Sequence, residues 1–269
     1  MLKLLLIFLS FTILYGNGYS LRKYSHVKEF YKDTLPIALK VGYKYNIPPA
    51  SLLAIAGVES GYGRGYVAQI TGNILSLGAN KNDTALPPLY LPYSKKDKKI
   101  LFDSNEIKKE KKENLIWKRQ AKSYKKDYRP KDIRGKEKDF EYFKYNKPEK
   151  LKAYEENFTD FAVKFISYNS KFKPFREARA FLDNQVKKYG KDILLEKWLN
   201  EKFIEMIGGK PNSFNYRESW PKKVKYILNN AGLVELVKDI KLYHKSFEDA
   251  WKSKNDIIPK KKESKNEIK

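Results

Sequence analysis

Glu59 is the residue of this chain whose position best suits it for chemistry. It ends an almost wholly apolar stretch, residues 51–63 (SLLAIAGVESGYG), and is followed closely by Gly61 and Gly63. The stretch leaves no polar face, so we expect a helix that is buried on all sides. A carboxyl at the C-terminal end of such a helix is desolvated and near the negative end of the helix dipole, and both effects raise its pKa. Such an acid can protonate a leaving oxygen, as cleavage of a glycosidic bond requires. On these residues alone, a local cap or an ion pair with Arg64 explains Glu59 equally well.

Prolines and glycines predict the bounds of the helices that position Glu59. Pro48 and Pro49 fit the start of the buried helix, and Gly61 fits its end. Thr34 and Pro36 predict the start of the helix that precedes it.

A basic lobe is predicted at residues 80–139, where prolines and lysine runs replace the apolar pattern. We expect it to be mobile and to contain a short helix at residues 106–121. The alternative is a disordered basic insertion without a specific role.

Helical periodicity returns at Tyr154 and predicts a mainly α-helical fold. The mobile lobe inserted in it has room for a small β-containing part. Three apolar stripes follow: Phe158, Phe161, Ala162, Phe165 and Ile166; then Phe175, Ala178, Phe181, Leu182 and Val186; then Ile193, Leu194, Trp198, Phe203, Ile204 and Ile207. Gly208 and Gly209 close the third stripe, Pro221 begins a further helix, and one more is expected within residues 234–247.

Length and charge indicate one exported, basic domain. The apolar run at residues 4–14, followed by Gly16 and Gly18, predicts a signal peptide at residues 1–18; an uncleaved anchor is the alternative. The domain is expected at residues 27–250, with a disordered basic tail at 252–269. The net charge is +24 for the 269 residues, and there is no cysteine, so the fold must be stable without disulfides. Outside the cytoplasm, this charge favours cell-wall glycan, anionic lipid surfaces or extracellular DNA as partners. Lysine abundance from an AT-rich genome explains the charge about equally well.

The buried helix and its flanks resemble bacterial glucosaminidases of the glycoside hydrolase family 73 type, including the Bax-like proteins. The matching residues are Pro49, Ser51, Leu53, Ala54, Ala56, Glu59, Ser60, Gly61 and Gly63, with Asn73 and Ile74 further on. Residues 157–178 and 220–228 are similar to the family's later helices. The chain departs from the family pattern at Ile55, Tyr62, Gly65, Gly72, Leu75, Ser76 and Trp220, where Gln, Trp, Ser, Asn, Phe, Gly and Tyr are usual.

The resemblance implies a lysozyme-like helical domain that hydrolyses the β-1,4 bond after N-acetylglucosamine in peptidoglycan, with Glu59 as proton donor. It implies a second acid on the lobe, or the substrate's own N-acetyl group helped by a tyrosine. We predict Glu106 for the acid; Asp83, Asp103, Glu110 and Glu113 are the other lobe acids that the sequence cannot rank. Sugar-binding side chains are predicted at Tyr62, Asn73, Tyr90, Tyr93, Tyr216 and Trp220, although each aromatic is about as often a packing residue.

Two other functions remain open on the sequence. A lytic transglycosylase uses one Glu on a related fold, and a wall-binding protein without catalysis would explain the departures at Leu75, Ser76 and Trp220. His26 and His244 have no acidic or Cys companions at ligand spacing, so neither a metal nor another cofactor is expected. A nucleic-acid partner is not expected either, because no recognition module is present. The expected location is the periplasm or the cell wall; the oligomeric state is not predicted.

Overall fold

The computed structural model describes residues 19–79, 90–101, 104–119, 125–130, 132–133 and 142–252. The predicted signal peptide and residues 253–269 of the predicted tail lie outside these ranges. The described part is mainly helical with a small three-stranded sheet, which confirms the predicted fold class. Within these ranges, no helix is long and apolar enough to cross a membrane.

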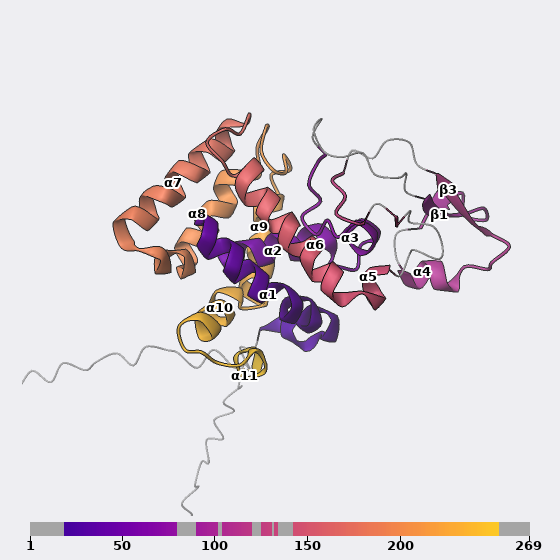
Figure 1. The fold of residues 1–269 in the computed structure, drawn as a ribbon, viewed down its shortest axis with the longest axis horizontal. Coiled ribbons are helices and arrows are strands. Elements are labelled where there is room, and N and C mark those ends of the chain that lie inside the picture. The colour runs from indigo at the N-terminus through magenta and orange to yellow at the C-terminus, as the bar shows by residue number, and fades with distance from the viewer. Residues whose placement is uncertain are drawn as a thin grey trace, which may run out of the picture.

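Helix α2 (Pro49–Ser60) lies at the centre of the molecule and confirms the buried helix predicted from the sequence (Figure 1). Its residues 49–57 are all buried, and it packs against α1, α8, α9 and α10. The helix ends where Gly61 adopts the left-handed conformation, with φ of 56°. Glu59 is therefore held at the C-terminal end of the most buried helix.

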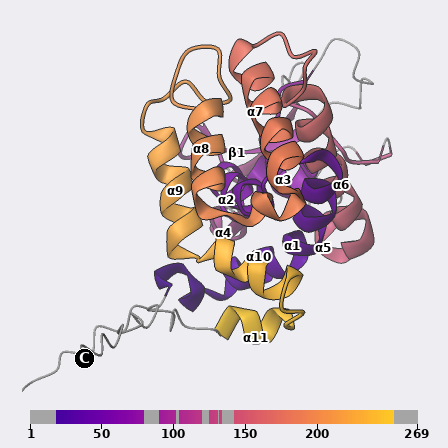
Figure 2. The same cartoon turned by 90° about the vertical axis from the view of Figure 1, so that its left-hand side faces the viewer.

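Helices from both ends of the chain surround α2, as Figure 2 shows. The helices of the body besides α2 are α1 (Ser25–Tyr45), α5 (Tyr142–Tyr145), α6 (Lys147–Asp160) with the π-helical turn η3 (Phe161–Phe165), α7 (Lys173–Tyr189), the 3-10 helix η4 (Lys191–Leu195), α8 (Lys197–Ile207), α9 (Trp220–Asn230), α10 (Leu233–Lys241) and α11 (Phe247–Lys252). The residues of the predicted stripes lie in the apolar core or pack against it, with the exception of Trp198, which is 48% exposed. Arg22, in the 3-10 helix η1 (Ser20–Lys23), donates to the carbonyl oxygens of Ala231, Gly232, Ala250 and Trp251 and so ties the two ends together.

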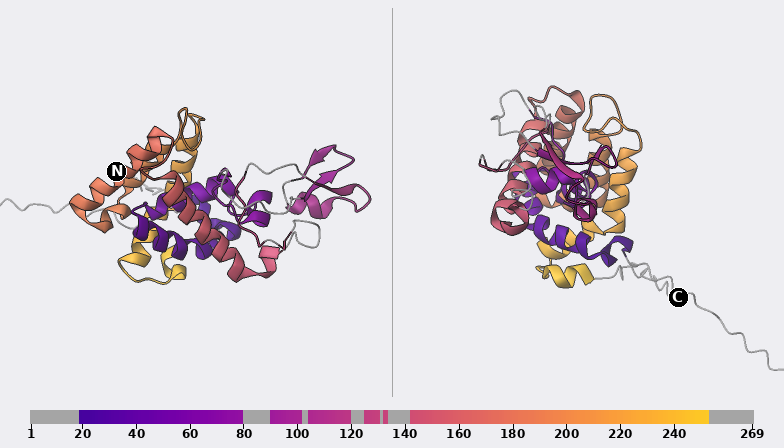
Figure 3. Two further views of the ribbon diagram at one scale, coloured as in Figure 1. Left: turned by 45° about the horizontal axis from the view of Figure 1, so that its top comes forward. Right: turned by 90° about the vertical axis from the view of Figure 1, so that its right-hand side faces the viewer.

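A lobe with a three-stranded sheet lies at one end of the molecule (Figures 1 and 3). Its central strand β1 (Tyr90–Ser94) pairs antiparallel with β2 (Lys99–Ile100) and with β3 (Leu115–Arg119), so the order is β2-β1-β3. The lobe also carries α4 (Ser104–Lys109), and α3 (Tyr66–Thr71) connects it to the body. Ile70, Leu101 and Ile107 form a small apolar cluster that is separate from the main core.

Two sequence predictions of helix bounds are wrong. Helix α1 begins at Ser25 rather than near Thr34, and Pro36 lies inside it. Thr34 is buried and its hydroxyl donates to the carbonyl of Phe30 one turn earlier, while the apolar face of α1 keeps the helix continuous past the proline. The predicted helix at residues 106–121 ends at Lys109, and residues 115–119 form β3 because Ile116 and Trp117 pair with β1.

Candidate functional site

Glu59 receives a hydrogen bond from the indole of Trp220. Trp220 Nε1 lies 2.7 Å from Glu59 Oε1 and joins the C-terminal end of α2 to the first residue of α9. An indole N–H is only a donor, so Oε1 accepts in both protonation states of the carboxyl. The proton of the acid form therefore lies on Oε2, which is the oxygen that can donate to another group.

The surroundings of Glu59 favour its protonated form. Burial raises the pKa of Glu59 above its usual value; the bond from Trp220 and the charges of Lys125 and Arg217 act in the opposite direction, but the net shift is upward. The causes follow from the fold, because the end of a buried helix takes water away from the carboxyl while leaving it next to helix carbonyls. The group has the electrostatic character of a general acid.

Trp220 is held in place by close packing. Its side chain is 3% exposed and lies against Phe214, with ring centroids 5.5 Å apart. A Cβ at Gly208 would overlap the six-membered part of the indole. The predicted sugar-binding role of Trp220 does not fit this placement, because the ring has no free face; instead Trp220 orients the carboxyl of Glu59.

Lys125 reaches the surroundings of Glu59 through a short segment that pairs with residues 73–78. Gly78 and Lys125 form an isolated antiparallel bridge, and Lys125 Nζ donates to the carbonyl of Ser76 at 2.7 Å. Ser76 has φ of 54°, in the region that favours glycine. The family pattern that the sequence resembles has a glycine at this position.

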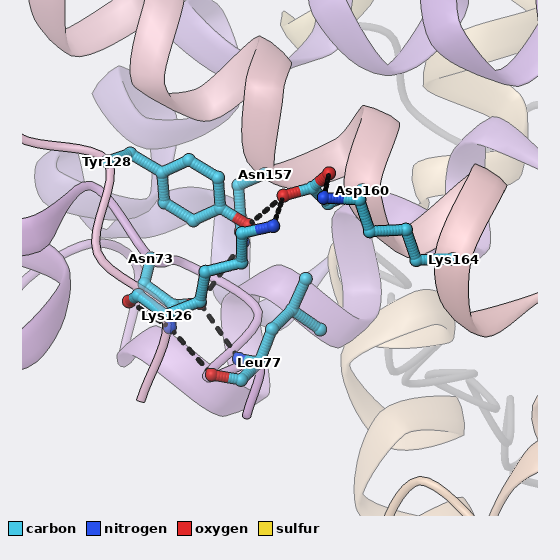
Figure 4. A network of polar contacts seen from close by, with 7 residues as sticks. All are labelled: Asn73, Leu77, Lys126, Tyr128, Asn157, Asp160 and Lys164. Atoms are coloured by element: carbon cyan, nitrogen blue, oxygen red, sulfur yellow. Dashed lines mark hydrogen bonds and ion pairs between the residues drawn. The ribbon is translucent and has the colours of Figure 1, made fainter. Parts of the chain in front are cut away.

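A buried polar network fixes this segment to α6 (Figure 4). Tyr128 donates to Asp160 Oδ2 at 3.0 Å, and Asp160 also pairs with Lys126 and with Lys164. Asn157 Nδ2 donates to the hydroxyl of Tyr128 at 3.1 Å. Because every partner is on the body or on residues 125–129, the network holds the Lys125 segment independently of the sheet.

Asn73 belongs to the same network and does not have the predicted sugar-binding position. It is 2% exposed; its amide nitrogen donates to the carbonyls of Leu77 and Lys126, and its amide oxygen accepts from the Leu77 N–H and from Asn157. All four hydrogen bonds of the amide are thus made inside the protein. Asn73 shapes the loop beside Glu59 and cannot contact a ligand without losing them.

Glu106, the predicted second acid, is placed on α4 in the lobe. Its carboxylate is about half exposed and lies 3.5 Å from Lys99 Nζ. It is not among the charged groups that shift the pKa of Glu59. The structure does not bring these two carboxyls together. Glu110 and Glu113 lie in the same lobe, whereas Asp83 and Asp103 fall outside the described residues.

The predicted tyrosines occupy three different surroundings. Tyr62, which has φ of 59°, is half-buried against Phe30 and Tyr31, three residues after Glu59. Tyr90 and Tyr93 are on β1, and Lys118 Nζ lies 3.1 Å from the centre of the Tyr93 ring. Tyr216 is 70% exposed and adjoins Arg217, so it is the predicted aromatic best placed to contact a ligand at Glu59.

Sequence reasoning missed Lys125 and Arg217 as the cations that act on Glu59. Arg217 could have been found from its position next to Tyr216, but no motif marks Lys125, which comes to the site through the bridge to Gly78. In the described ranges, no group of three His, Asp or Glu side chains could hold a metal ion.

Comparison of the chain with models of known protein families, with curated proteins and with solved structures finds no match. The resemblance at residues 49–74 therefore stands on the motif residues alone.

Proposed function

We propose that this protein is an exported peptidoglycan glycosidase that cleaves the β-1,4 bond after N-acetylglucosamine, with Glu59 as the general acid. The observation that carries the proposal is the hydrogen bond from Trp220 to Oε1 of a carboxyl whose pKa is raised by burial. It leaves Oε2 as the proton-bearing oxygen at the end of a rigid helix, as proton donation to a leaving glycosidic oxygen requires.

Lys125 and Arg217 support a polyanionic substrate at this site. They are the charged groups that act on Glu59 among the described residues, and both are cationic. Together with the net charge of +24, they favour a glycan that bears carboxylates over a neutral one. A cation near the acid stabilises negative charge that develops on the leaving oxygen, whereas a second carboxylate would destabilise it.

A lytic transglycosylase is the second candidate, because the described surroundings of Glu59 contain no second carboxylate that acts on it. A two-carboxylate mechanism needs the second group within about 5 to 9.5 Å of the first. A mechanism with one acid, in which a group of the substrate completes the reaction, needs no such partner.

Digestion of purified wall sacculi tests the proposal. The wild-type protein should release soluble fragments, and Glu59→Gln should lower the rate by about 10³-fold, because general acid catalysis typically contributes 10²–10⁴-fold. Folding of the variant is checked by circular dichroism. Mass spectrometry then separates the candidates, since a glucosaminidase leaves reducing N-acetylglucosamine ends and a transglycosylase leaves 1,6-anhydro muramic acid.

Two outcomes would contradict the proposal. Undiminished release by the folded Glu59→Gln variant would exclude Glu59 as the acid. Salt-sensitive binding to sacculi without any soluble product from the wild-type protein would show a wall-binding protein without catalysis instead.

A further inference from the structure

A cavity of about 320 Å³ lies on the α1 side of the turn that follows Glu59. Its walls come from α1, from the turn at residues 62–64, from α5 and α6, and from α4 of the lobe. Glu59 and Trp220 are not among its lining residues, so the cavity is separate from the site described above. The turn is shared, however, because Tyr62 lines the cavity three residues after Glu59.

The wall of the cavity includes a tyrosine hydroxyl that has no hydrogen-bond partner among the described residues. Tyr154 is 5% exposed and lines the cavity, and its hydroxyl forms no hydrogen bond with any described residue. Gly63, at φ of 73°, lets this hydroxyl approach the turn, since a Cβ there would lie 3.3 Å from it. The hydroxyl is not among the buried side-chain atoms that lack a hydrogen bond, so it is open to the cavity, where it can donate to or accept from a ligand or water.

The charges around the mouth of the cavity favour an anion. Arg64 and Lys108 line it, and neither forms an ion pair with another described residue. Asp33 also lines the cavity, but its two oxygens are taken by Lys147 at 2.7 Å and Lys150 at 2.8 Å. Burial of Asp33 is outweighed by these two lysines, which hold its pKa below the usual value, so its charge is present and neutralised. Glu29 is the remaining anionic wall residue.

The walls favour a ligand that combines an apolar part with a carboxylate. Phe30, Phe143 and the ring of Tyr62 line the cavity beside the charged groups. A planar carboxylate matches the two-pronged donor geometry of Arg64, and the hydroxyl of Tyr154 can donate to the same group or to a carbonyl beside it. Apolar walls with a few convergent polar groups are typical of small-ligand sites.

We infer that this cavity binds the carboxylate-bearing peptide attached to the glycan, with Arg64 and Tyr154 as its anchors. The inference rests on the proposed function for the identity of the peptide. The geometry is compatible, because residues 59 and 62 are at most about 11 Å apart along the chain and a four-residue peptide spans about 14 Å when extended. A glycan held at Glu59 could therefore place its peptide in the cavity.

Calorimetric titration of the full chain carrying Glu59→Gln tests the inference without turnover. The probes are the free wall tetrapeptide, the same peptide with its carboxylates amidated, and a peptide-free glycan tetramer. The free tetrapeptide should bind, Arg64→Gln should weaken this binding about tenfold, and Tyr154→Phe should weaken it severalfold. Tyr168→Phe, which removes an exposed hydroxyl bonded to Asp183, is the matched control and should leave affinity unchanged.

Three results would overturn the inference: no binding of the free tetrapeptide, equal binding of the amidated peptide, or affinity that neither Arg64→Gln nor Tyr154→Phe changes. Each is independent of glycan cleavage. If the protein binds the tetrapeptide but does not digest sacculi, the cavity assignment holds and the proposed activity fails. If it digests sacculi but does not bind the tetrapeptide, the proposed activity holds and the cavity assignment fails.

Discussion

The helical body and the sheet lobe each carry a glutamate that the sequence favours for catalysis, but they surround it differently. Glu59, on the body, ends a helix that is buried among four others and accepts a hydrogen bond from a buried indole. Glu106, on the lobe, lies on a helix of six residues, is half exposed and pairs with Lys99. The body has an extensive apolar core, whereas the lobe has a cluster of three buried residues. On the body, burial against the large core is the main cause that raises the pKa of Glu59.

The largest expected contrast is catalytic. Glu59→Gln should reduce release of soluble fragments from sacculi about 10³-fold, whereas Glu106→Gln should stay within about twofold of the wild type. The reason is that Glu106 does not act on Glu59 and is exposed to solvent. Rates are measured under identical salt. If Glu106→Gln lost as much activity as Glu59→Gln, the lobe would have to close onto the site, and the expected difference between the two glutamates would be wrong.

The next contrast concerns stability. Asn73→Ala should lower the free energy of unfolding by about 3 kcal/mol, because it removes the side-chain partner of buried backbone groups of Leu77 and Lys126 and one of the hydrogen bonds of Asn157. Its counterpart on the lobe, Asn114→Ala, should cost about 0.5 kcal/mol or less, since its bond to Glu110 is long and half exposed. Urea denaturation followed by far-UV circular dichroism measures both. Equal losses would mean that the lobe is as tightly packed as the body.

Trp220→Phe should move the pH profile of activity. The bond from Trp220 favours the charged form of Glu59, so removing it raises the pKa of Glu59 further. Because the acid must be protonated to act, the alkaline limb of kcat/KM should move to higher pH. Trp198→Phe, a change of an exposed indole on α8, is the control. An alkaline limb that does not move would show that Trp220 serves packing alone.

The smallest effect is on the pH dependence of folding. The pKa of Glu59 is higher in the folded protein than in the unfolded chain, so the folded state binds more protons and loses stability as pH rises from about 4.5 through the folded pKa. Glu59→Gln removes this loss, and its Tm relative to wild type should rise with pH across that window. A constant Tm difference would argue against a raised pKa at Glu59.

The sequence predicts the body better than the lobe for a physical reason. The apolar run before Glu59, with prolines before it and glycines after it, encodes α2 through local signals, and the later helices follow from their stripes. The sheet depends on pairing between Tyr93 and Ile116, which are distant in sequence. Both lie among lysines, so no local alternation of apolar and polar residues predicts the strands. Likewise, the motif around Asn73 predicts a sugar-binding side chain. Its structural role becomes visible only from its hydrogen bond with Asn157, which is distant in sequence.

The close approach of Gly208 to Trp220 constrains how this protein can evolve. Any side chain at position 208 would push the indole aside, so the glycine and the tryptophan should be inherited as a pair, or replaced together by a larger residue and a smaller ring. A methyl group added at position 208 would displace the indole of Trp220 and so change the pKa of Glu59 at the C-terminal end of α2. Gly208→Ala is thus a way to change the acidity of Glu59 without replacing either Glu59 or Trp220.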